Sequence, residues 1–289
     1  MSILNVVILA IVQGLAELLP VSSSAHVVVA EKLLGLDPSS PPMTLLLVML
    51  HTGTMFAVIV YFWRQWRGTY FKDAAAFKSV AGRIVLATIV TGFVGEIIIK
   101  ILEKTALKDL PHSEVEDLFG HLEFIAPALA AAGLLILAAG LRERRPAPIA
   151  VAPGAEELSL KHAGIIGFVQ GLCLPFRGFS RSGATISSGM LLGVAKPLAE
   201  RFSFALAVVL TPPVVVREVL RLRHAPDLHA GELSSVALLC VLGAFLAFVA
   251  GLVALKWLSR WLESGRWYLF GCYCLLASVA VTLLHRAGY

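Results

Sequence analysis

Long apolar runs are the feature that most restricts how this chain can fold. Six stretches reach or approach the roughly 20 residues that a helix needs to cross the hydrocarbon core of a bilayer. They lie at residues 43–63, 80–101, 122–141, 202–218, 235–257 and 266–285. Only 15% of the 289 residues are charged, whereas a soluble domain usually carries about 25%. We therefore predict an all-α polytopic membrane protein in which residues 1–289 form a single integral membrane domain.

Two further apolar regions are interrupted near their middles. Residues 3–35 and 163–195 contain proline, serine and glycine between short apolar segments, so each is too broken for one span and too short for two. Unpaired backbone is not tolerated where it faces lipid, and interrupted segments survive only inside the protein or along a cavity. We predict that each region is a re-entrant helix pair, which enters and leaves the membrane on the same side.

The order of these segments predicts an inverted-topology repeat. A re-entrant pair followed by three full spans occurs twice, so an odd number of crossings separates the pairs and they enter from opposite faces. The two pairs also share the tripeptide Gln-Gly-Leu, at residues 13–15 and 170–172. A repeat predicts such matches at equivalent positions. We place repeat 1 at about residues 1–141, a proline-rich linker at 142–160, and repeat 2 at about 161–289.

The net charge of +5 is explained by membrane topology rather than by nucleic-acid binding, because the basic residues stand in short tracts between apolar runs. Lys and Arg are concentrated in the cytoplasmic loops of membrane proteins. The loops that we assign to that side contain Arg64, Arg67, Lys72, Lys78, Arg142, Arg144, Arg145, Lys161, Lys196, Arg201 and Arg260. The opposite loops hold fewer basic residues, diluted by acidic ones. Both termini are therefore predicted to lie outside the cytoplasm.

The first interruption combines a carboxylate, hydroxyls and an imidazole. Gln13 and Glu17 are four residues apart on one helical face. Ser22 and Ser23 follow a proline, and serines directly before an apolar helical run are typical N-caps. His26 follows them at helical spacings of four and three, so its imidazole and a hydroxyl can share a face. Ionisable groups are costly within membrane sequence and suggest a function by default.

The second interruption supplies groups that bind anions. Its polar and glycine residues include Arg177, Ser180, Arg181, Ser182, Gly183 and Thr185. Free N–H groups at a helix start attract anions, and glycine lets the backbone approach a ligand closely. Arginine adds a fork that matches phosphate oxygens. If both interruptions meet near the midplane, two helix starts and an arginine face Glu17, which predicts a phosphate site with a place for a metal ion.

Several of these residues also have a structural interpretation. A single Ser or Thr inside a membrane usually hydrogen-bonds its own helix. Arg177 can instead reach the headgroups or a lipid phosphate. His51, within the first full span, is as consistent with a packed core histidine as with a cavity residue. The clustering of Glu17, His26 and Arg181 with hydroxyls is what favours a functional site.

Both interruptions resemble signatures of a known family. Residues 13–26, from Gln-Gly-Leu-Ala-Glu to Ser-Ser-Ser-Ala-His, look like the first signature of the bacterial undecaprenyl pyrophosphate phosphatase family. Residues 178–185, Gly-Phe-Ser-Arg-Ser-Gly-Ala-Thr, resemble its second signature. The resemblance extends over nearly the whole chain. It implies a bacterial inner-membrane hydrolase that removes the terminal phosphate of undecaprenyl pyrophosphate, recycles the lipid carrier of cell-wall peptidoglycan synthesis and confers bacitracin resistance. With the orientation predicted from the loop charges, both termini would then be periplasmic.

The resemblance and the residue chemistry together assign roles. Catalysis is expected of Glu17, Ser23, His26 and Arg181, and phosphate binding of Ser22, Ser180, Ser182, Gly183, Thr185 and Arg177. A divalent cation, Mg²⁺ or Ca²⁺, is expected at Glu17 and Gln13, although Gln13 stands where the family often has Glu. Ser23 is the preferred nucleophile beside His26 as base or orienter, while His26 itself and a metal-activated water are alternatives. The segment Pro175-Phe-Arg-Gly178 also departs from the usual Pro-Gly entry.

A transporter is the alternative class of protein. Inverted repeats with broken helices and a midplane site are typical of alternating-access carriers, and such a carrier could flip a lipid phosphate or move a small anion. The combination of nucleophile, imidazole, carboxylate and arginine exceeds what anion binding needs, which favours an enzyme. The expected partners are a polyprenyl pyrophosphate and membrane lipids, not nucleic acid. The sequence leaves the oligomeric state open, with a homodimer as the assembly to test.

Overall fold

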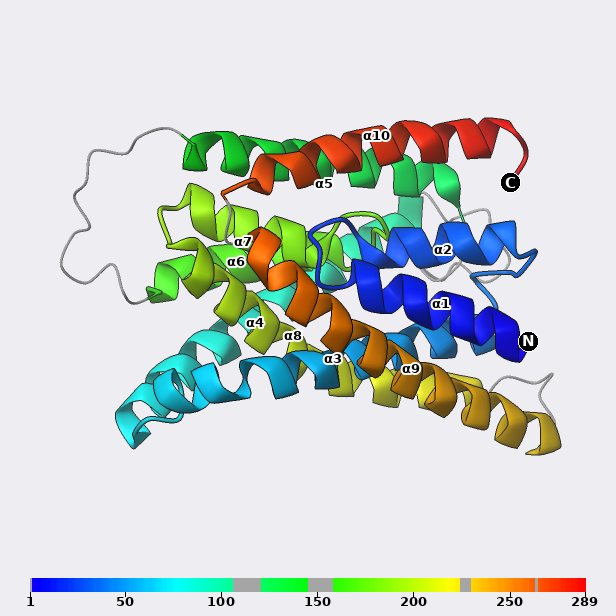
Figure 1. The fold of residues 1–289 in the computed structure, drawn as a ribbon, viewed down its shortest axis with the longest axis horizontal. Coiled ribbons are helices and arrows are strands. Elements are labelled where there is room, and N and C mark those ends of the chain that lie inside the picture. Colours follow the sequence, from blue (N-terminus) through cyan, green and yellow to red (C-terminus); the bar gives the residue numbers. More distant parts are fainter. Residues whose placement is uncertain (1, 106–120, 145–157, 224–229, 263–264) are drawn as a thin grey trace.

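The computed structural model describes residues 2–105, 121–144, 158–223, 230–262 and 265–289. Within these ranges the regular secondary structure consists of ten helices (Figure 1). They are α1 (Ile3–Ala16), α2 (Ser23–Leu33), α3 (Pro41–Thr69), α4 (Ala74–Thr105), α5 (Leu122–Glu143), α6 (Leu160–Cys173), α7 (Arg181–Leu191), α8 (Lys196–Arg223), α9 (Ala230–Leu262) and α10 (Trp267–Arg286). Most of the predicted linker at 142–160 lies outside the described residues.

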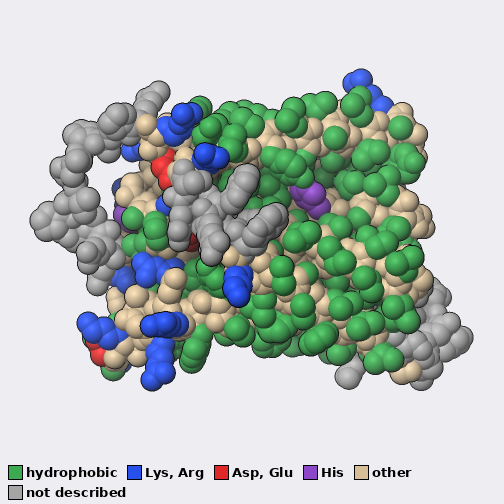
Figure 2. All heavy atoms as spheres, viewed as in Figure 1, with side chains coloured by type: hydrophobic (Ala, Val, Ile, Leu, Met, Phe, Trp, Pro, Cys, Tyr) green, Lys and Arg blue, Asp and Glu red, His purple; other side chains and the backbone are tan. Residues whose placement is uncertain are grey.

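Six of these helices are long and apolar enough to cross a membrane. The segments are Pro41–Thr69, Ala74–Thr105, Leu122–Glu143, Lys196–Arg217, Val236–Lys256 and Trp267–Arg286. Each contains or overlaps one of the predicted spans, so the all-α, multi-pass prediction is confirmed. Apolar side chains cover most of the visible face of the molecule (Figure 2). The long helix α4 also exposes large apolar side chains, among them Phe93 and Ile89. Such a surface is suited to lipid as solvent.

The two interrupted regions each form a helix, a turn and a shorter helix. Helices α1 and α6 both contain 14 residues, and α2 and α7 both contain 11. The short helices begin alike, because the N-cap hydroxyls of Ser22 and Ser180 each accept a backbone N–H from the first turn. They also end alike, at Gly35 and Gly193, whose φ values of 70° and 88° stop a helix at low cost. The two regions therefore share one local design.

The two helix pairs approach each other from opposite ends of the molecule. In Figure 1 the α1–α2 pair extends from the end where both termini lie, and the α6–α7 pair extends from the other end. Their turns meet in the middle of the fold. A Cβ added to Gly183 would come within 3.1 Å of the Pro20 carbonyl oxygen, so the turns pack directly against each other. This contact brings the two polar segments of the sequence together.

Small residues allow the long helices to pack closely around these turns. Gly14 of α1 lies against Gly251 of α9, and Gly171 of α6 lies against Val94 of α4. Helices α5 and α10 approach closely at Gly271. Small residues at such crossings let backbones touch where burial from water supplies little driving force. The resulting frame holds the two turns in fixed positions inside the bundle.

Candidate active site

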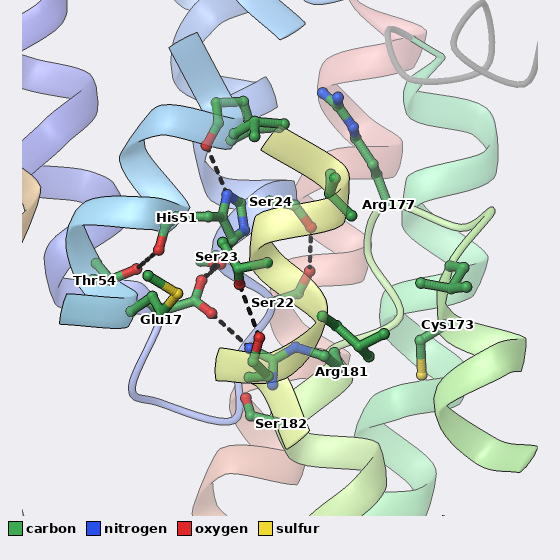
Figure 3. Close-up of a pocket in the computed structure, with 18 of the residues that line it drawn as sticks. Glu17, Ser22, Ser23, Ser24, His51, Thr54, Cys173, Arg177, Arg181 and Ser182 are labelled. Atoms are coloured by element: carbon green, nitrogen blue, oxygen red, sulfur yellow. Dashed lines mark hydrogen bonds and ion pairs between the residues drawn. The ribbon is translucent and has the colours of Figure 1, made fainter. Parts of the chain in front are cut away.

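A cavity of about 370 Å³ opens where the two turns meet. Its polar wall comes from the starts of α2 and α7 and from the end of α1, and its apolar wall comes mainly from α3 and α8. Figure 3 shows the polar side chains of both turns pointing toward one another in this cavity. The arrangement is therefore a charged and hydroxyl-rich centre beside an apolar surface, inside a bundle of membrane-spanning length.

Glu17 is the centre of the polar wall. It is the C-cap residue of α1, and only 9% of its surface is exposed. Its Oε2 accepts hydrogen bonds from Gln13 Nε2 at 2.7 Å and from Ser23 Oγ at 2.5 Å. Its Oε1 accepts a bond from Arg181 Nη2 at 2.9 Å, and His51 Nε2 lies 3.3 Å from Oε2. A buried charge persists only with such partners, so the carboxylate organises groups from four helices.

Ser23 is held against this carboxylate by an unusual backbone conformation. Ser22, the preceding N-cap residue, has φ 67° and ψ 83°, and it has the only positive φ among the described non-glycine residues. Left-handed backbone at a residue with a Cβ is costly and is often found at functional sites. Here it turns the chain sharply, so that α2 begins at Ser23 with the hydroxyl on Glu17. A hydroxyl bonded to a carboxylate is the geometry of a nucleophile and its base.

Arg181 supplies positive charge from the second turn. It is the first residue of α7, directly after the N-cap Ser180. One nitrogen, Nη2, donates to Glu17, whereas Nη1 is buried and has no hydrogen-bond partner among the residues that the structure describes. Both Ser180 and Ser182 line the same cavity. A buried donor without an acceptor, beside a helix N-terminus, is a binding position for an anion such as phosphate.

A second Glu and Arg lie farther along the same two segments. Arg177 lines the cavity, but its side chain extends away from the Glu17 group (Figure 3). Its charge acts on Glu31 of α2, whose side chain is fully buried. Arg177 therefore lines the cavity and also interacts electrostatically with α2.

Some of the other sequence-predicted residues lie at the cavity, and others form hydrogen bonds that stabilise the helices around it. Ser22 lines the cavity, and Gln13 lies behind Glu17. Gly183 and Thr185 lie outside the lining. The N–H of Gly183 donates to the Ser180 hydroxyl, and the Thr185 hydroxyl contacts the Arg181 carbonyl and Ser203 Oγ. Their bonds hold the first turn of α7 in place rather than facing the ligand position.

His26 is not brought to Ser23, which differs from the expectation from helical spacing. Its Nδ1 lies 2.7 Å from the Ser22 carbonyl oxygen, and its Nε2 lies 2.6 Å from Tyr273 Oη of α10. The ring lines a separate, apolar pocket of about 470 Å³. A spacing of four allows a side chain to meet either the hydroxyl or the carbonyl of the earlier residue, and here the carbonyl and Tyr273 take both ring nitrogens.

His51 of α3 occupies the position beside Glu17 instead. It lines the cavity together with Thr54, and Figure 3 shows both side chains on the inner face of α3. The sequence signal for it is the polar segment His-Thr-Gly-Thr at residues 51–54, inside an otherwise apolar span. That segment alone does not tell which helix His51 faces.

Comparison with known proteins assigns the chain to a family. A family model described as bacitracin resistance protein BacA matches residues 6–280. The chain belongs to the BacA family. It is 54% identical to undecaprenyl-diphosphatase 2 of Acinetobacter baylyi, over 98% of each protein. It is 36% identical to an undecaprenyl-diphosphatase of Desulfosudis oleivorans, over 93% of this chain and 94% of the relative. For the Rhodopirellula baltica undecaprenyl-diphosphatase the identity is 31%, over 98% of each.

Of the two residues predicted to bind a divalent cation in this BacA family member, Glu17 lines the cavity and Gln13 does not. Gln13 Oε1 is buried and accepts no hydrogen bond from the described part of the chain. Glu17 Oε1 accepts one bond, from Arg181, and a carboxylate oxygen has about two acceptor sites. Carboxylate and amide oxygens fit Mg²⁺ and Ca²⁺. Among the described residues no three His, Cys, Asp or Glu side chains form a metal cluster.

The position of His26 leads to a prediction for this BacA family member. His26→Asn keeps a group near the Ser22 carbonyl, and Tyr273→Phe removes the ring's other partner. We expect each variant to keep kcat within about tenfold of the wild type, short of the roughly 10²–10⁴-fold that general acid–base catalysis contributes. Phosphate release from a polyprenyl diphosphate measures it. A decrease in kcat of more than about 10²-fold in the His26 variant, with unchanged thermal stability, would show that His26 takes part in catalysis.

Proposed function

We propose that this chain hydrolyses undecaprenyl diphosphate to undecaprenyl phosphate and inorganic phosphate. The observation that carries the proposal is the contact of Ser23 Oγ and Arg181 Nη2 with the two oxygens of one buried carboxylate, Glu17. Relatives named undecaprenyl-diphosphatase support it. The reaction recycles the lipid carrier of cell-wall synthesis, and the family's description links it to bacitracin resistance.

The proposed mechanism gives each group a role. The Ser23 hydroxyl attacks the terminal phosphorus while its proton passes to Glu17 Oε2. The bond from that phosphorus to the bridging oxygen breaks, and the lipid monophosphate leaves. Water then attacks the phosphoserine and the Ser23 oxygen takes back the proton from Glu17 Oε2, which releases inorganic phosphate and restores both the hydroxyl and the carboxylate. Arg181 Nη1 and the N-terminus of α7 hold the phosphate oxygens throughout, because positioning and charge stabilisation dominate phosphoryl transfer.

We also propose a divalent cation at this site, beside the phosphates. Glu17 and Gln13 Oε1 would hold it from the protein side, and the pyrophosphate oxygens would complete its ligands. Bound there, Mg²⁺ or Ca²⁺ supplies charge neutralisation for the transferring phosphoryl group. Since Gln13 is uncharged, this BacA family member should bind the cation more weakly than a variant with Gln13→Glu.

The apolar wall of the cavity suits the isoprenoid chain. Met55 and Val58 of α3 face Phe204 and Val208 of α8 along this wall. A polyprenyl tail that lies between these two helices places its diphosphate against Arg181. The tail then stays in apolar surroundings while only the headgroup meets polar side chains.

The fold is proposed to be an inverted-topology repeat with two re-entrant helix pairs. Support comes from the equal lengths of α1 and α6 and of α2 and α7. Further support comes from Gly14 and Gly171 of the shared tripeptide, which each pack their helix against a long helix of the other half. The proposed repeats are residues 1–141 and 161–289, joined by 142–160 within one membrane domain.

The protein is proposed to lie in the bacterial inner membrane with both termini in the periplasm. Most visible Lys and Arg side chains gather at the end of the molecule opposite the termini (Figure 2). Basic residues favour the cytoplasmic side. Protease accessibility of tags at each terminus in sealed spheroplasts tests the orientation. A homodimer stays a prediction, for which cross-linking in native membranes is the measurement.

Phosphate release by the purified protein in detergent tests the proposed function. With undecaprenyl diphosphate and Mg²⁺ or Ca²⁺, we expect multiple turnovers, which a chelator reduces and added cation restores. A transporter or flippase of a lipid phosphate would release no phosphate without a chemical step, so detergent solution separates the two classes. The absence of release from any polyprenyl diphosphate, by protein of native stability, would contradict the proposal.

A further inference from the structure

His51 is held at both ring nitrogens beside the proposed catalytic carboxylate. Its Nδ1 lies 2.8 Å from the Leu47 carbonyl oxygen, one helical turn earlier in α3. Its Nε2 lies 3.3 Å from Glu17 Oε2. The side chain is 30% exposed, and it lines the cavity that contains Ser23 and Arg181. The ring thus joins the frame of α3 to the acidic centre of the site.

The hydrogen bond from Nδ1 to the Leu47 carbonyl oxygen determines which ring nitrogen of His51 faces Glu17. A carbonyl oxygen only accepts hydrogen bonds, so Nδ1 must carry a hydrogen and donate it to Leu47. Nε2 is therefore the nitrogen that faces Oε2. The contact fixes the orientation of the ring, because rotation would break the bond to the main chain of α3.

The two oxygens of Glu17 have different neighbours. Oε2 is surrounded by Gln13 from α1, Ser23 from α2 and His51 from α3. Oε1 faces Arg181 from α7. His51 is the only one of these groups that ties the carboxylate to a membrane-spanning helix, since α1, α2 and α7 are the short helices of the interrupted regions. It therefore limits rotation of the carboxylate relative to the fixed bundle.

We propose that His51 is a positioning residue that holds Glu17 Oε2 against the Ser23 hydroxyl. The proposal rests on the proposed function, because it concerns the same transfer of the Ser23 proton to Oε2. A ring that also carries a hydrogen on Nε2 donates it to the carboxylate, and this bond fixes the oxygen that takes the Ser23 proton. Misplacement of a reacting group by about 1 Å can cost roughly 10²-fold in rate.

Three substitutions separate the two contacts of His51. His51→Gln places an amide near the Nε2 position and can keep the contact with Glu17. His51→Asn places an amide near the Nδ1 position and keeps only the contact with the Leu47 carbonyl. His51→Leu removes both. The matched control is His285→Leu, because His285 Nε2 lies 3.5 Å from Glu123 Oε2 near the end of α10, outside the cavity.

The test is a steady-state comparison of kcat and KM for undecaprenyl diphosphate in detergent. We expect His51→Asn and His51→Leu to lower kcat by about 10²-fold with KM changed by less than about threefold, because positioning acts on the chemical step. His51→Gln should keep kcat within about tenfold, and His285→Leu should match the wild type. Thermal midpoints and size-exclusion profiles of all variants monitor folding.

The outcomes distinguish this proposal from the proposed function. Equal kcat losses in His51→Gln and His51→Asn would overturn it, as would a His51→Leu enzyme whose kcat is unchanged or whose loss is confined to KM. Because two of the variants are polar and close in size to histidine, the comparison stands even if His51→Leu fails to fold. If the wild-type protein itself releases no phosphate, the proposed function fails before any His51 variant is measured.

Discussion

Replacement of Arg181 with alanine is expected to lower kcat/KM for undecaprenyl diphosphate by about 10³-fold. Arg181 Nη1 is the buried donor that we propose binds a phosphate oxygen. Loss of an arginine that stabilises a transferring phosphoryl group costs about 10³–10⁵-fold in other enzymes. Arg181→Lys keeps a positive charge beside Glu17 but loses the fork. We therefore expect an intermediate loss of about 10²-fold for the lysine variant. Phosphate release over a range of substrate concentrations measures both.

The matched control for Arg181 is Arg144→Ala. Arg144 is an exposed arginine that packs over the Tyr268 ring at the far end of α5 and α10. Its replacement should leave kcat/KM unchanged. Near wild-type turnover in Arg181→Ala would remove Arg181 from the phosphate site and, with it, the role of the second turn in catalysis.

Ser23→Ala is expected to lower kcat by about 10³-fold or more, because it removes the proposed nucleophile, on which the other groups of the site act. The neighbouring hydroxyl provides the control. Ser24 also lines the cavity, but its Oγ lies 3.4 Å from Ser22 Oγ and has no contact with Glu17. Ser24→Ala should lose less than about tenfold, as expected for one neutral hydrogen bond.

A phosphoserine provides a direct check on the Ser23 prediction. Rapid acid quench of wild-type protein during turnover, followed by peptide mass spectrometry, should find phosphate on Ser23. Unimpaired turnover in Ser23→Ala would exclude Ser23 as nucleophile and leave direct attack by water as the route.

Much of the fold follows from the sequence, because hydropathy over about 20 residues reports membrane spans directly. The two interrupted regions were also predictable, since proline and serine leave backbone groups that lipid cannot satisfy. Glu17 and Arg181 are 164 residues apart in sequence. Their proximity follows from the order of the segments if both regions are re-entrant. A buried charge is costly unless it is paired, so the carboxylate of the first region and the guanidinium of the second are expected to form an ion pair.

The details of the site were less predictable, because they depend on contacts between helices. The spacing of His26 from Ser22 and Ser23 is compatible with a hydroxyl partner, yet the ring bonds to a carbonyl and to Tyr273 of α10. His51 shares no local pattern with Glu17, and only the packing of α1 against α3 brings them together. The sequence predicted a histidine in the site, but the structure brings a different histidine to Glu17.

The roles expected of Gly183 and Thr185 show a similar limit. Both belong to a segment that begins a helix, where backbone N–H groups can bind an anion or an N-cap side chain. The sequence does not choose between these partners. In the structure the Ser180 hydroxyl takes the Gly183 N–H, and Thr185 bonds within α7 and to α8.

The central claim is that the two turns form one catalytic unit, and a double-mutant cycle between Ser23 and Arg181 tests it most directly. Residues that act together lose activity in a strongly non-additive way. If Ser23→Ala costs about 10³-fold and Arg181→Lys about 10²-fold, we predict that the double variant stays near 10³-fold below wild type in kcat/KM. An additive loss near 10⁵-fold would mean that the two turns act independently, which would contradict a single shared site.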